Sequence, residues 1–365
     1  MTRAVGIVYD PASSRHVHRP REGRMELKDL IAKASSGATL SADEAEAAFH
    51  RVMEGEASPV QMAALLVALR SRGAAPGEVA GGVRALRAAM VPVKARAPEE
   101  LVDTCGTGGG VSTFNISTAA ALVAAGAGVR VAKHGNRSFT SRSGSADVLE
   151  ALDVRIDLSA EEMEGVLEEA GIVFMFAPTL HPAMRHVGPV RRELAIPTIM
   201  NILGPLTNPA GARRQVVGVA DPSLVELVAK ALQELGHLQA LVVHGEPGMD
   251  ELSPVGPTQV TEVDGDSIRS WQVRPEDVGL TAARLEELAG GEPEENARII
   301  EKVLQGRERG GPRTAVLLNA GAAIFVSGRM ADLAQGVAAA EEAVESGSAW
   351  EALQRLRAAS RKVGE

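Results

Sequence analysis

From residue 101 onward the chain alternates short apolar runs with segments of helical periodicity, and no other feature constrains its fold as strongly. The apolar runs predict strands at 101–105, 129–133, 172–176, 216–220 and 240–244, with helices between them. Strands that alternate with helices in this way form βα units around a largely parallel sheet. We therefore expect an α/β domain over residues 98–365, with a central, mostly parallel sheet flanked by helices. Asp264-Gly265, at the centre of 259–273, also predicts a β-hairpin.

Residues 25–97 have a different pattern, which predicts a small all-helical domain. Ser41 with Glu44, and Ser58 with Gln61, have the spacing of capping boxes, and Pro59 takes the first helical position. Apolar residues recur at helical spacing through four short segments. Such short helices have little core of their own, so we expect their apolar faces to pack against segment 178–206 or against a second subunit.

Residues 1–24 are expected to be a flexible extension. They contain five arginines and two histidines without helical periodicity, and they lack the uninterrupted apolar core of a signal peptide. His16 and His18 form an isolated His-x-His pair, which we interpret as incidental rather than as a metal site.

Composition argues against several classes of protein. The formal net charge of −9 and the aromatic content of 2% disfavour a nucleic-acid partner, which requires surplus Lys and Arg and aromatic platforms for bases. Cys105 is the only cysteine, so no intrachain disulfide can form. The most apolar run, 119–129, is too short to cross a bilayer. We therefore expect a cytoplasmic protein without a membrane span, in which Cys105 is a small buried residue rather than a nucleophile.

Residues 103–147 combine a glycine loop, two turns rich in hydroxyl side chains and one lysine, Lys133. The loop, GTGGG at 106–110, lacks the Gly-Lys-Ser/Thr of a P-loop, and the third position of a GxGxxG fingerprint holds Val111. Four clustered glycines alone are more often only a tight turn. The polar residues Asn115, Ser117 and Thr118 open an apolar helix, however, and a helix N-terminus favours an anion. Together these features predict a site for a polyanionic ligand.

Six motifs follow one another along the chain as they do in the anthranilate phosphoribosyltransferase family. They are GTGGG with TFNIST, KHGNRSFTSRSGSADVLEALDV, HPAMRHVGPVRREL, NILGPLTNPAG and VVHGEPGMDELSP, and the resemblance covers about residue 25 to the C-terminus. It implies a helical domain, an α/β domain that binds phosphoribosyl diphosphate (PRPP), and a homodimer. It also implies magnesium-dependent transfer of the phosphoribosyl group to the amine of anthranilate, which gives N-(5-phosphoribosyl)anthranilate and pyrophosphate in tryptophan biosynthesis.

The resemblance also assigns the donor site. Displacement of pyrophosphate needs its charge held and neutralised and the amine placed near C1 of the ribose, and no strong general acid or base is required. The residues implied for PRPP binding are Gly106, Thr107, Gly108, Gly109, Gly110, Thr113, Asn115, Ser117, Thr118, Lys133, Ser141 and Ser145. Asp250 and Glu251, with the Ser117 hydroxyl, are implied as ligands of Mg²⁺, which prefers carboxylates and substrate oxygens. A solvated acidic loop is the alternative for this pair.

The acceptor site is assigned in the same way. Arg191 matches the position that holds the carboxylate of anthranilate, for which a guanidinium is the natural partner. Asn136 matches the amide near the substrate, and with Arg191 it would position the reactants. Gly106, His134 and His181 match positions that line the acceptor pocket, although a purely structural role stays open for each histidine. Residues 204–206 would form a mobile wall of this pocket.

Three departures from the family and two other functions remain to be weighed. Gly110 stands in a shortened loop where the family commonly has aspartate, residues 195–198 read Ala-Ile-Pro-Thr instead of Gly-Ile-Arg-Thr, and Met200 replaces a common phenylalanine. A pyrimidine nucleoside phosphorylase shares the architecture but would cleave thymidine or uridine with phosphate. A non-catalytic nucleic-acid-binding relative would need a basic face. KHGNR and the absence of a lysine-rich phosphate loop disfavour the phosphorylase, and the acidic pair and the net charge disfavour the nucleic-acid-binding relative.

Overall fold

A single seven-stranded sheet forms the centre of the molecule, which the computed structural model describes over residues 26–138 and 142–363. The strand order is β3-β2-β1-β4-β5-β6-β7. The first five strands are parallel, and β6 and β7 add an antiparallel hairpin at one edge. The bounds are β1 (Val102–Gly106), β2 (Val131–Gly135), β3 (Ile172–Phe176), β4 (Arg214–Gly218), β5 (Gln239–Gly245), β6 (Thr258–Asp264) and β7 (Ser267–Val273). The predicted α/β architecture is confirmed.

Two strands, β2 and β4, begin two residues away from their predicted starts. β4 starts at Arg214 because Arg214 and Gln215 pair with Val102 and Asp103 of β1, so the ladder includes two polar residues that an apolar pattern does not detect. β2 starts at Val131 rather than at Val129. The backbone N–H of Val129 donates to the carbonyl of Ala124 and therefore belongs to the turn that ends the preceding helix, α5 (Ile116–Gly126).

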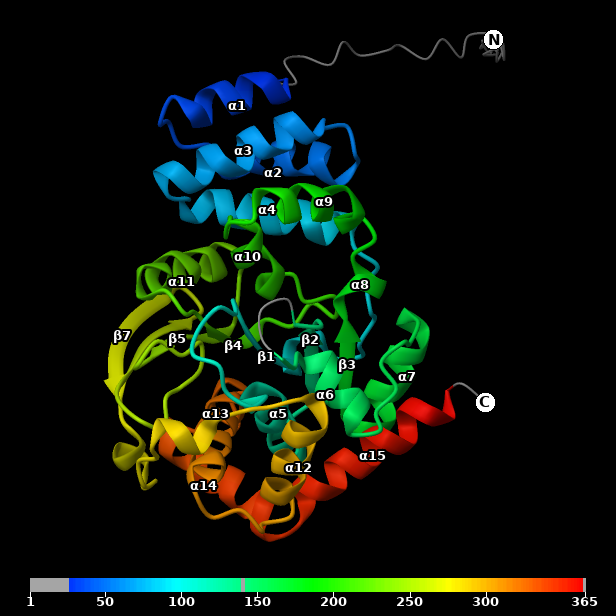
Figure 1. Cartoon of the computed structure of the whole chain (residues 1–365), viewed down its shortest axis with the longest axis vertical. Helices are drawn as coiled ribbons and strands as arrows, with labels where there is room; N and C mark the ends of the chain where they lie inside the picture. The colour runs from blue at the N-terminus through cyan, green and yellow to red at the C-terminus, as the bar shows by residue number, and fades with distance from the viewer. Residues whose placement is uncertain (1–25, 139–141, 364–365) are drawn as a thin grey trace, which may run out of the picture.

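Alternating residues of β4 and β5 face two different hydrophobic cores. Leu241 and Val243 of β5 belong to the core formed with the C-terminal helices, whereas Ala240 and Val242 face the core shared with the helical domain. The first core packs α5 with helices that lie below the sheet in Figure 1: α12 (Pro293–Leu304), α13 (Gly311–Val326), α14 (Leu333–Glu345) and α15 (Ser348–Lys362). At the β3 side lie α6 (Ser145–Ala151) and α7 (Ala160–Ala170).

The helical domain consists of α1 (Leu27–Ser35), α2 (Ala42–Met53), α3 (Pro59–Arg72) and α4 (Pro76–Ala89). Both predicted capping boxes are present, since Ser41 and Ser58 each accept the third backbone N–H of their helix and receive the reciprocal side-chain contact. The core of this domain also contains residues of α9 (Met184–Leu194), α10 (Met200–Leu203) and α11 (Val225–Glu234). α9 packs against α2 and α3. Figure 1 shows α11 between the helical domain and the sheet.

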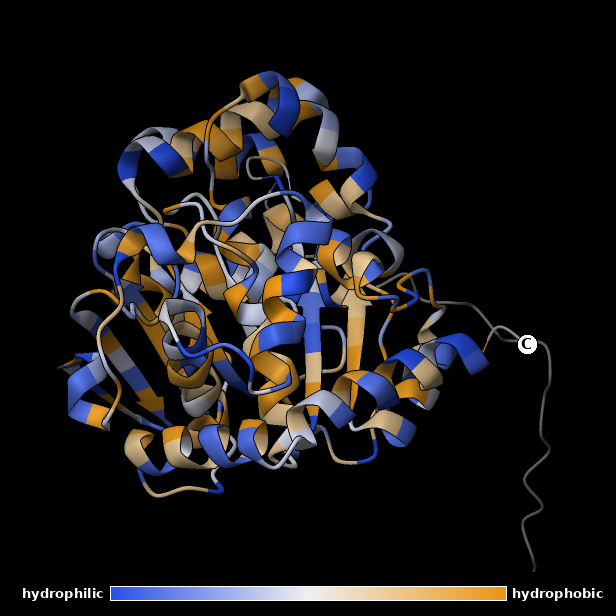
Figure 2. Ribbon diagram, turned by 60° about the horizontal axis from the view of Figure 1, so that its bottom comes forward, coloured by the Kyte–Doolittle hydropathy of each residue, from blue (hydrophilic) through white to orange (hydrophobic). Residues whose placement is uncertain are grey.

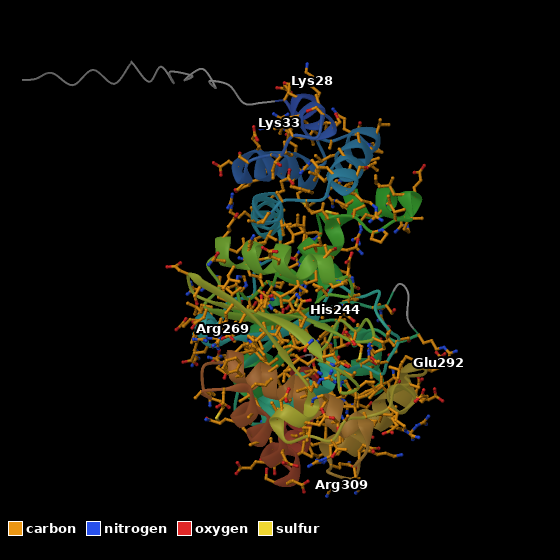
Figure 3. The ribbon with its side chains drawn as sticks, turned by 90° about the vertical axis from the view of Figure 1, so that its left-hand side faces the viewer. Lys28, Lys33, His244, Arg269, Glu292 and Arg309 are labelled. Atoms are coloured by element: carbon orange, nitrogen blue, oxygen red, sulfur yellow. The ribbon has the colours of Figure 1, made fainter. Side chains whose placement is uncertain are left out.

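The distribution of residue types agrees with this two-part architecture. Figure 2 shows hydrophobic residues gathered on the strands and on the helix faces turned toward them. In Figure 3, Lys28 and Lys33 lie on the helical domain and Arg309 lies at the opposite end of the molecule. Within the described ranges, none of the helices combines the length and apolar character needed to cross a membrane. The extension predicted at 1–24 lies outside the described residues.

Candidate functional site

Four parallel strands end in glycine at the same edge of the sheet, at Gly106, Gly135, Gly218 and Gly245. Residues 248–251, the acidic segment, cross this edge. A Cβ atom on Gly218 would lie 1.5 Å from the carbonyl oxygen of Asp250, and one on Gly106 would lie 2.5 Å from Asp250 Oδ2. These two strands therefore require glycine at their ends, because the acidic segment packs directly on their backbone.

The glycine loop is bonded to the acidic segment. The backbone N–H of Gly108 donates to Asp250 Oδ2 at 2.8 Å, and that of Val111 donates to the carbonyl of Gly248 at 3.0 Å. The Thr107 N–H donates to the carbonyl of Gly218 at 2.9 Å. A Cβ on Gly110 would lie 2.7 Å from the Gly248 carbonyl oxygen, so this close packing explains why glycine stands where the family commonly has aspartate.

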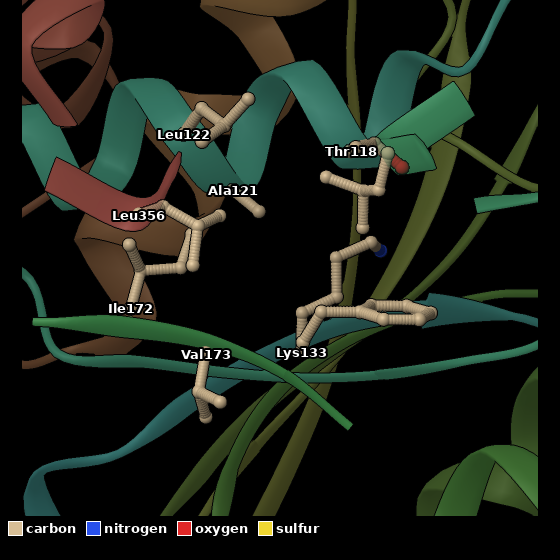
Figure 4. A pocket seen from close by; sticks show the side chains of 9 residues that line it. Thr118, Ala121, Leu122, Lys133, Ile172, Val173 and Leu356 are labelled. Carbon is tan, nitrogen blue, oxygen red and sulfur yellow. The ribbon is translucent and has the colours of Figure 1, made fainter. Parts of the chain in front are cut away.

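Lys133, one of the residues predicted to bind the donor, is almost fully buried. Its Nζ donates to the carbonyl of Thr104 at 2.6 Å and to Ser117 Oγ at 3.2 Å. Figure 4 shows the side chain rising from β2 toward the first turn of α5, beside Thr118. Its stem lines a cavity of ≈ 10 Å³ together with Leu122, Ile172 and other apolar residues. Burial lowers the pKa of the Lys133 ammonium, and the negative charge of Asp103 opposes that effect.

The acidic pair provides oxygen atoms that suit magnesium. Burial raises the pKa of Asp250, and burial together with the charge of Asp250 raises the pKa of Glu251 well above its usual value, with Lys133 acting in the opposite direction. Glu251 Oε2 is buried and has no hydrogen-bond partner among the described residues. Two partly buried carboxyl groups in adjacent residues offer hard oxygen donors of the kind Mg²⁺ binds, whereas the Ser117 hydroxyl accepts from Lys133. Across 26–138 and 142–363, no group of three or more His, Cys, Asp and Glu side chains could hold a metal alone.

The remaining donor residues cluster around Asn115, which precedes α5. Asn115 Nδ2 donates to the carbonyl of Ser143 at 3.0 Å, and its Oδ1 accepts from Ser143 Oγ at 3.1 Å. Thr113 Oγ1 donates to the neighbouring carbonyl of Phe114, and Ser145 begins α6. Thr118 Oγ1 is buried without a partner in the described part of the chain. Ser141 lies outside the described residues.

Two histidines of the predicted acceptor pocket are in contact. His134 Nε2 and His181 Nε2 lie 3.2 Å apart, and both side chains are buried. Burial lowers the pKa of His134 to about 3 and that of His181 to about 4. Both imidazoles are therefore neutral at neutral pH, and a single proton lies between the two nitrogens. Neither ring is suited to act as a strong base.

Arg191 and Asn136, the other predicted acceptor residues, come from different elements. Arg191 lies in the last turn of α9, and its Nη2 donates to Asn201 Oδ1 at 3.4 Å. Burial lowers the pKa of its guanidinium, which keeps its charge in proteins nonetheless. Asn136 follows β2, and its Oδ1 accepts the backbone N–H of Arg137 at 2.7 Å. Arg191 thus lies on a helix that packs with the helical domain, whereas Asn136 lies directly after β2, at the edge of the sheet where the parallel strands end.

Asp103 is a site residue that the sequence motifs did not single out. It is fully buried in β1 and accepts hydrogen bonds from the His134 N–H at 3.1 Å, Asn208 Nδ2 at 2.8 Å and Gln215 Nε2 at 3.3 Å. It therefore joins the end of β2 to the connection that follows residue 206. A charged residue inside an apolar run was the available signal, because a buried carboxylate must find partners.

The chain matches the models of both domains of one enzyme class. Residues 28–90 match the helical bundle domain of a glycosyl transferase family, and residues 98–350 match the α/β domain of the same family. An anthranilate phosphoribosyltransferase from Rubrobacter xylanophilus is 54% identical over 92% of this chain and 98% of its own length. The chain therefore belongs to the anthranilate phosphoribosyltransferase family.

Solved structures support the same relationship. The crystal structure of anthranilate phosphoribosyltransferase from Thermus thermophilus superposes with a TM-score of 0.87 at 47% identity, covering 91% of this chain and 99% of that chain. The enzyme from Saccharomyces cerevisiae, in complex with PRPP and Mg, superposes with a TM-score of 0.83 at 28% identity, covering 93% of this chain and 99% of that chain.

Proposed function

We propose that this chain transfers the phosphoribosyl group of PRPP to the amine of anthranilate, with release of pyrophosphate. The observation that carries the proposal is the hydrogen-bonded junction between the glycine loop and the acidic segment, beside the buried Lys133. It places backbone amides, an ammonium and two carboxylates at the ends of parallel strands, where ligands bind in α/β sheets. The family membership supports the choice of substrates.

In this proposal the donor residues act by holding charge. Amides of the glycine loop, the ammonium of Lys133 and the amide of Asn115 bind oxygens of PRPP and stabilise the negative charge that develops on the departing pyrophosphate. Asp250, Glu251 and Ser117 hold Mg²⁺, which supplies further neutralisation of the diphosphate. The fit rests on the unpartnered Glu251 Oε2 and on the all-oxygen donor set.

The acceptor residues act by positioning. Arg191 binds the carboxylate of anthranilate, and Asn136 and the neutral His134–His181 pair line the pocket around the ring. The amine of anthranilate is already a nucleophile when it is neutral, so the reaction needs close placement at C1 rather than a strong base. The low pKa values of both histidines agree with a site that contains no such base.

A fluorescence assay tests the proposal directly. Purified full-length protein mixed with PRPP, Mg²⁺ and anthranilate should consume the fluorescence of anthranilate, and omission of PRPP or addition of a chelator should stop the reaction. A folded, metal-supplied protein that leaves anthranilate unchanged would exclude the proposed activity. The same preparation incubated with thymidine or uridine and phosphate tests the phosphorylase alternative, which predicts release of the free base.

A homodimer and a cytoplasmic location complete the proposal. The side chains of Val60 and Val67, seven positions apart on α3, are 78% and 37% exposed and give this face of the helical domain an apolar strip for contact with a second copy. Light scattering on the purified protein should give twice the chain mass. A monomer at micromolar concentration would contradict this part of the proposal alone.

A further inference from the structure

Two buried asparagines of the C-terminal helices form hydrogen bonds to residues in or next to the proposed donor site. Asn296 of α12 is 1% exposed and Asn319 of α13 is 5% exposed. Neither belongs to a motif of the family resemblance. A buried side-chain amide is costly unless its hydrogen bonds are made, so the partners of each asparagine indicate what it stabilises.

Asn296 fixes the orientation of Asn115. Its Nδ2 donates to Asn115 Oδ1 at 2.9 Å, and its own Oδ1 accepts the backbone N–H of Gly291 at 2.8 Å. The Asn115 amide cannot rotate by half a turn, because its NH₂ would then face the NH₂ of Asn296 and its oxygen would face the carbonyl of Ser143. Ser143 Oγ also donates to Asn115 Oδ1. One N–H of Asn115 donates to the Ser143 carbonyl, and the other has no partner in the described ranges.

Asn319 fixes the backbone that follows the acidic pair. Its Oδ1 accepts the N–H of Leu252 at 3.0 Å, and its Nδ2 donates to the carbonyls of Leu252 at 2.9 Å and Ala315 at 2.9 Å. Both backbone polar groups of Leu252 are therefore held by one side chain of α13. Leu252 directly follows Glu251, so these bonds limit how far the acidic pair can move.

We propose that Asn296 and Asn319 are positioning residues with separate tasks: Asn296 aligns the Asn115 amide for the diphosphate of PRPP, and Asn319 holds Asp250 and Glu251 in place for the metal. The inference rests on the proposed function, because it assumes that PRPP and Mg²⁺ bind here. Neither asparagine contacts the ligand. Each acts through one residue or segment, so their effects should differ in kind.

Calorimetric binding of PRPP to full-length protein, at low and at saturating Mg²⁺ and without anthranilate, separates the two tasks. Asn296→Asp replaces the donor that faces Asn115 Oδ1 with an acceptor, so the Kd for PRPP should rise about tenfold at both Mg²⁺ concentrations. Asn319→Asp keeps the acceptor for the Leu252 N–H but loses both donated bonds. It should weaken PRPP binding about tenfold at low Mg²⁺ and much less at saturation, because the metal site is what moves.

A control variant and a milder pair of substitutions keep the test decisive. Ser360 of α15 is equally buried but hydrogen-bonds to Arg155 and Arg357, away from the donor site, so Ser360→Ala reports general destabilisation and should bind PRPP as the wild type does. If either aspartate variant fails to fold, Asn296→Ser and Asn319→Ser should show the same contrast with smaller amplitude. In steady state, the KM for anthranilate should stay nearly constant in every variant.

The outcomes distinguish this inference from the proposed function. Equal losses for both asparagine variants at both Mg²⁺ concentrations, or losses no larger than that of Ser360→Ala, would overturn the positioning roles while wild-type binding and turnover stand. A wild-type protein that does not bind PRPP with Mg²⁺ would overturn the proposed function and this inference together.

Discussion

Substitution of Gly218 by alanine should disable the site while leaving the sheet folded. The added Cβ would lie 1.5 Å from the carbonyl oxygen of Asp250 and 2.2 Å from its carbonyl carbon, and real Cβ contacts are essentially never under 3.0 Å. The backbone of Asp250 must therefore retreat by roughly 1.5–2 Å, and a misplacement of about 1 Å already costs on the order of 10²-fold in rate. That retreat also breaks the bond from the Gly108 N–H to Asp250 Oδ2.

Gly218→Ala should accordingly lower kcat/KM by at least about 100-fold in the anthranilate fluorescence assay, with a higher Mg²⁺ requirement. Overpacking should reduce the free energy of unfolding by about 1–3 kcal/mol, measured by urea denaturation. Gly165→Ala is the matched control, because its Cβ would meet only Val363 Cγ1 at an ordinary 3.8 Å. Gly165 lies inside α7, so the control should stabilise the chain by about 0.5–1 kcal/mol and keep full activity.

A Gly218→Ala protein with activity and Mg²⁺ dependence within about twofold of wild type would refute the reasoning, because the acidic segment could then move without consequence. Loss of activity in the Gly165→Ala control would refute it as well. A folded Gly218→Ala protein that binds PRPP normally at every Mg²⁺ concentration would show that Asp250 is not held by the end of β4.

Three further predictions concern the residues proposed to bind substrate and metal, the end of α9 and the buried histidines. Arg191→Ala should raise the KM for anthranilate about 10–100-fold, because a charge-assisted contact is lost. Asp250→Ala should instead impair the Mg²⁺-dependent use of PRPP. Equal, small effects of the two substitutions in steady-state kinetics would contradict both roles. Ala195 follows the last residue of α9 and has φ 52°, a left-handed conformation that favours glycine. Ala195→Gly should therefore increase the free energy of unfolding by up to ~1 kcal/mol. A lower urea midpoint would contradict this. Because burial lowers the pKa of His134 to about 3 and of His181 to about 4, the unfolded chain binds protons that the folded chain excludes. The contribution of the two histidines to the free energy of unfolding should be fully present above about pH 6.5. It should fall as the pH drops from there toward 4, by up to ~1.4 kcal/mol per pH unit for each ring. A urea midpoint that is equal at pH values of about 7.5 and 5 would contradict this.

The architecture could be predicted from the sequence because its determinants are local. The apolar runs predicted five parallel strands, and Asp264-Gly265 predicted the hairpin. The spacing of Ser41 with Glu44 predicted the start of α2. The polar start of β4 could not be predicted, because Arg214 and Gln215 enter the ladder only through pairing with β1 and β5. The register depends on how two strands pair, so it cannot be predicted from the residues of one strand.

The candidate site was predictable only where residues close together in the sequence form it. The glycine loop, Lys133 and the acidic pair stood out because glycine, lysine and paired carboxylates are informative at strand ends. The roles of Gly218, Asn296 and Asn319 depend on contacts between segments far apart in the sequence, with Asp250, Asn115 and Leu252 respectively. Nothing in the local pattern of α12 or α13 marks these asparagines, since a buried asparagine is identified by its partners.

The charge of the donor site could not be read from its phosphate-binding motifs either. The glycine loop and Lys133 alone predict a positive site for a polyanion. In the structure, the carboxyl groups of Asp103 and Glu251 act on Lys133, and Asp250 acts on Glu251. All three carboxyl groups have raised pKa values because burial opposes their charge. Raised pKa values mean that burial favours the protonated form of these groups, so the site is not the preformed positive pocket that the glycine loop predicts. In the proposed reaction, Mg²⁺ held by Asp250 and Glu251 would favour their ionised form and would offset the negative charge of the diphosphate, which the glycine loop alone does not achieve.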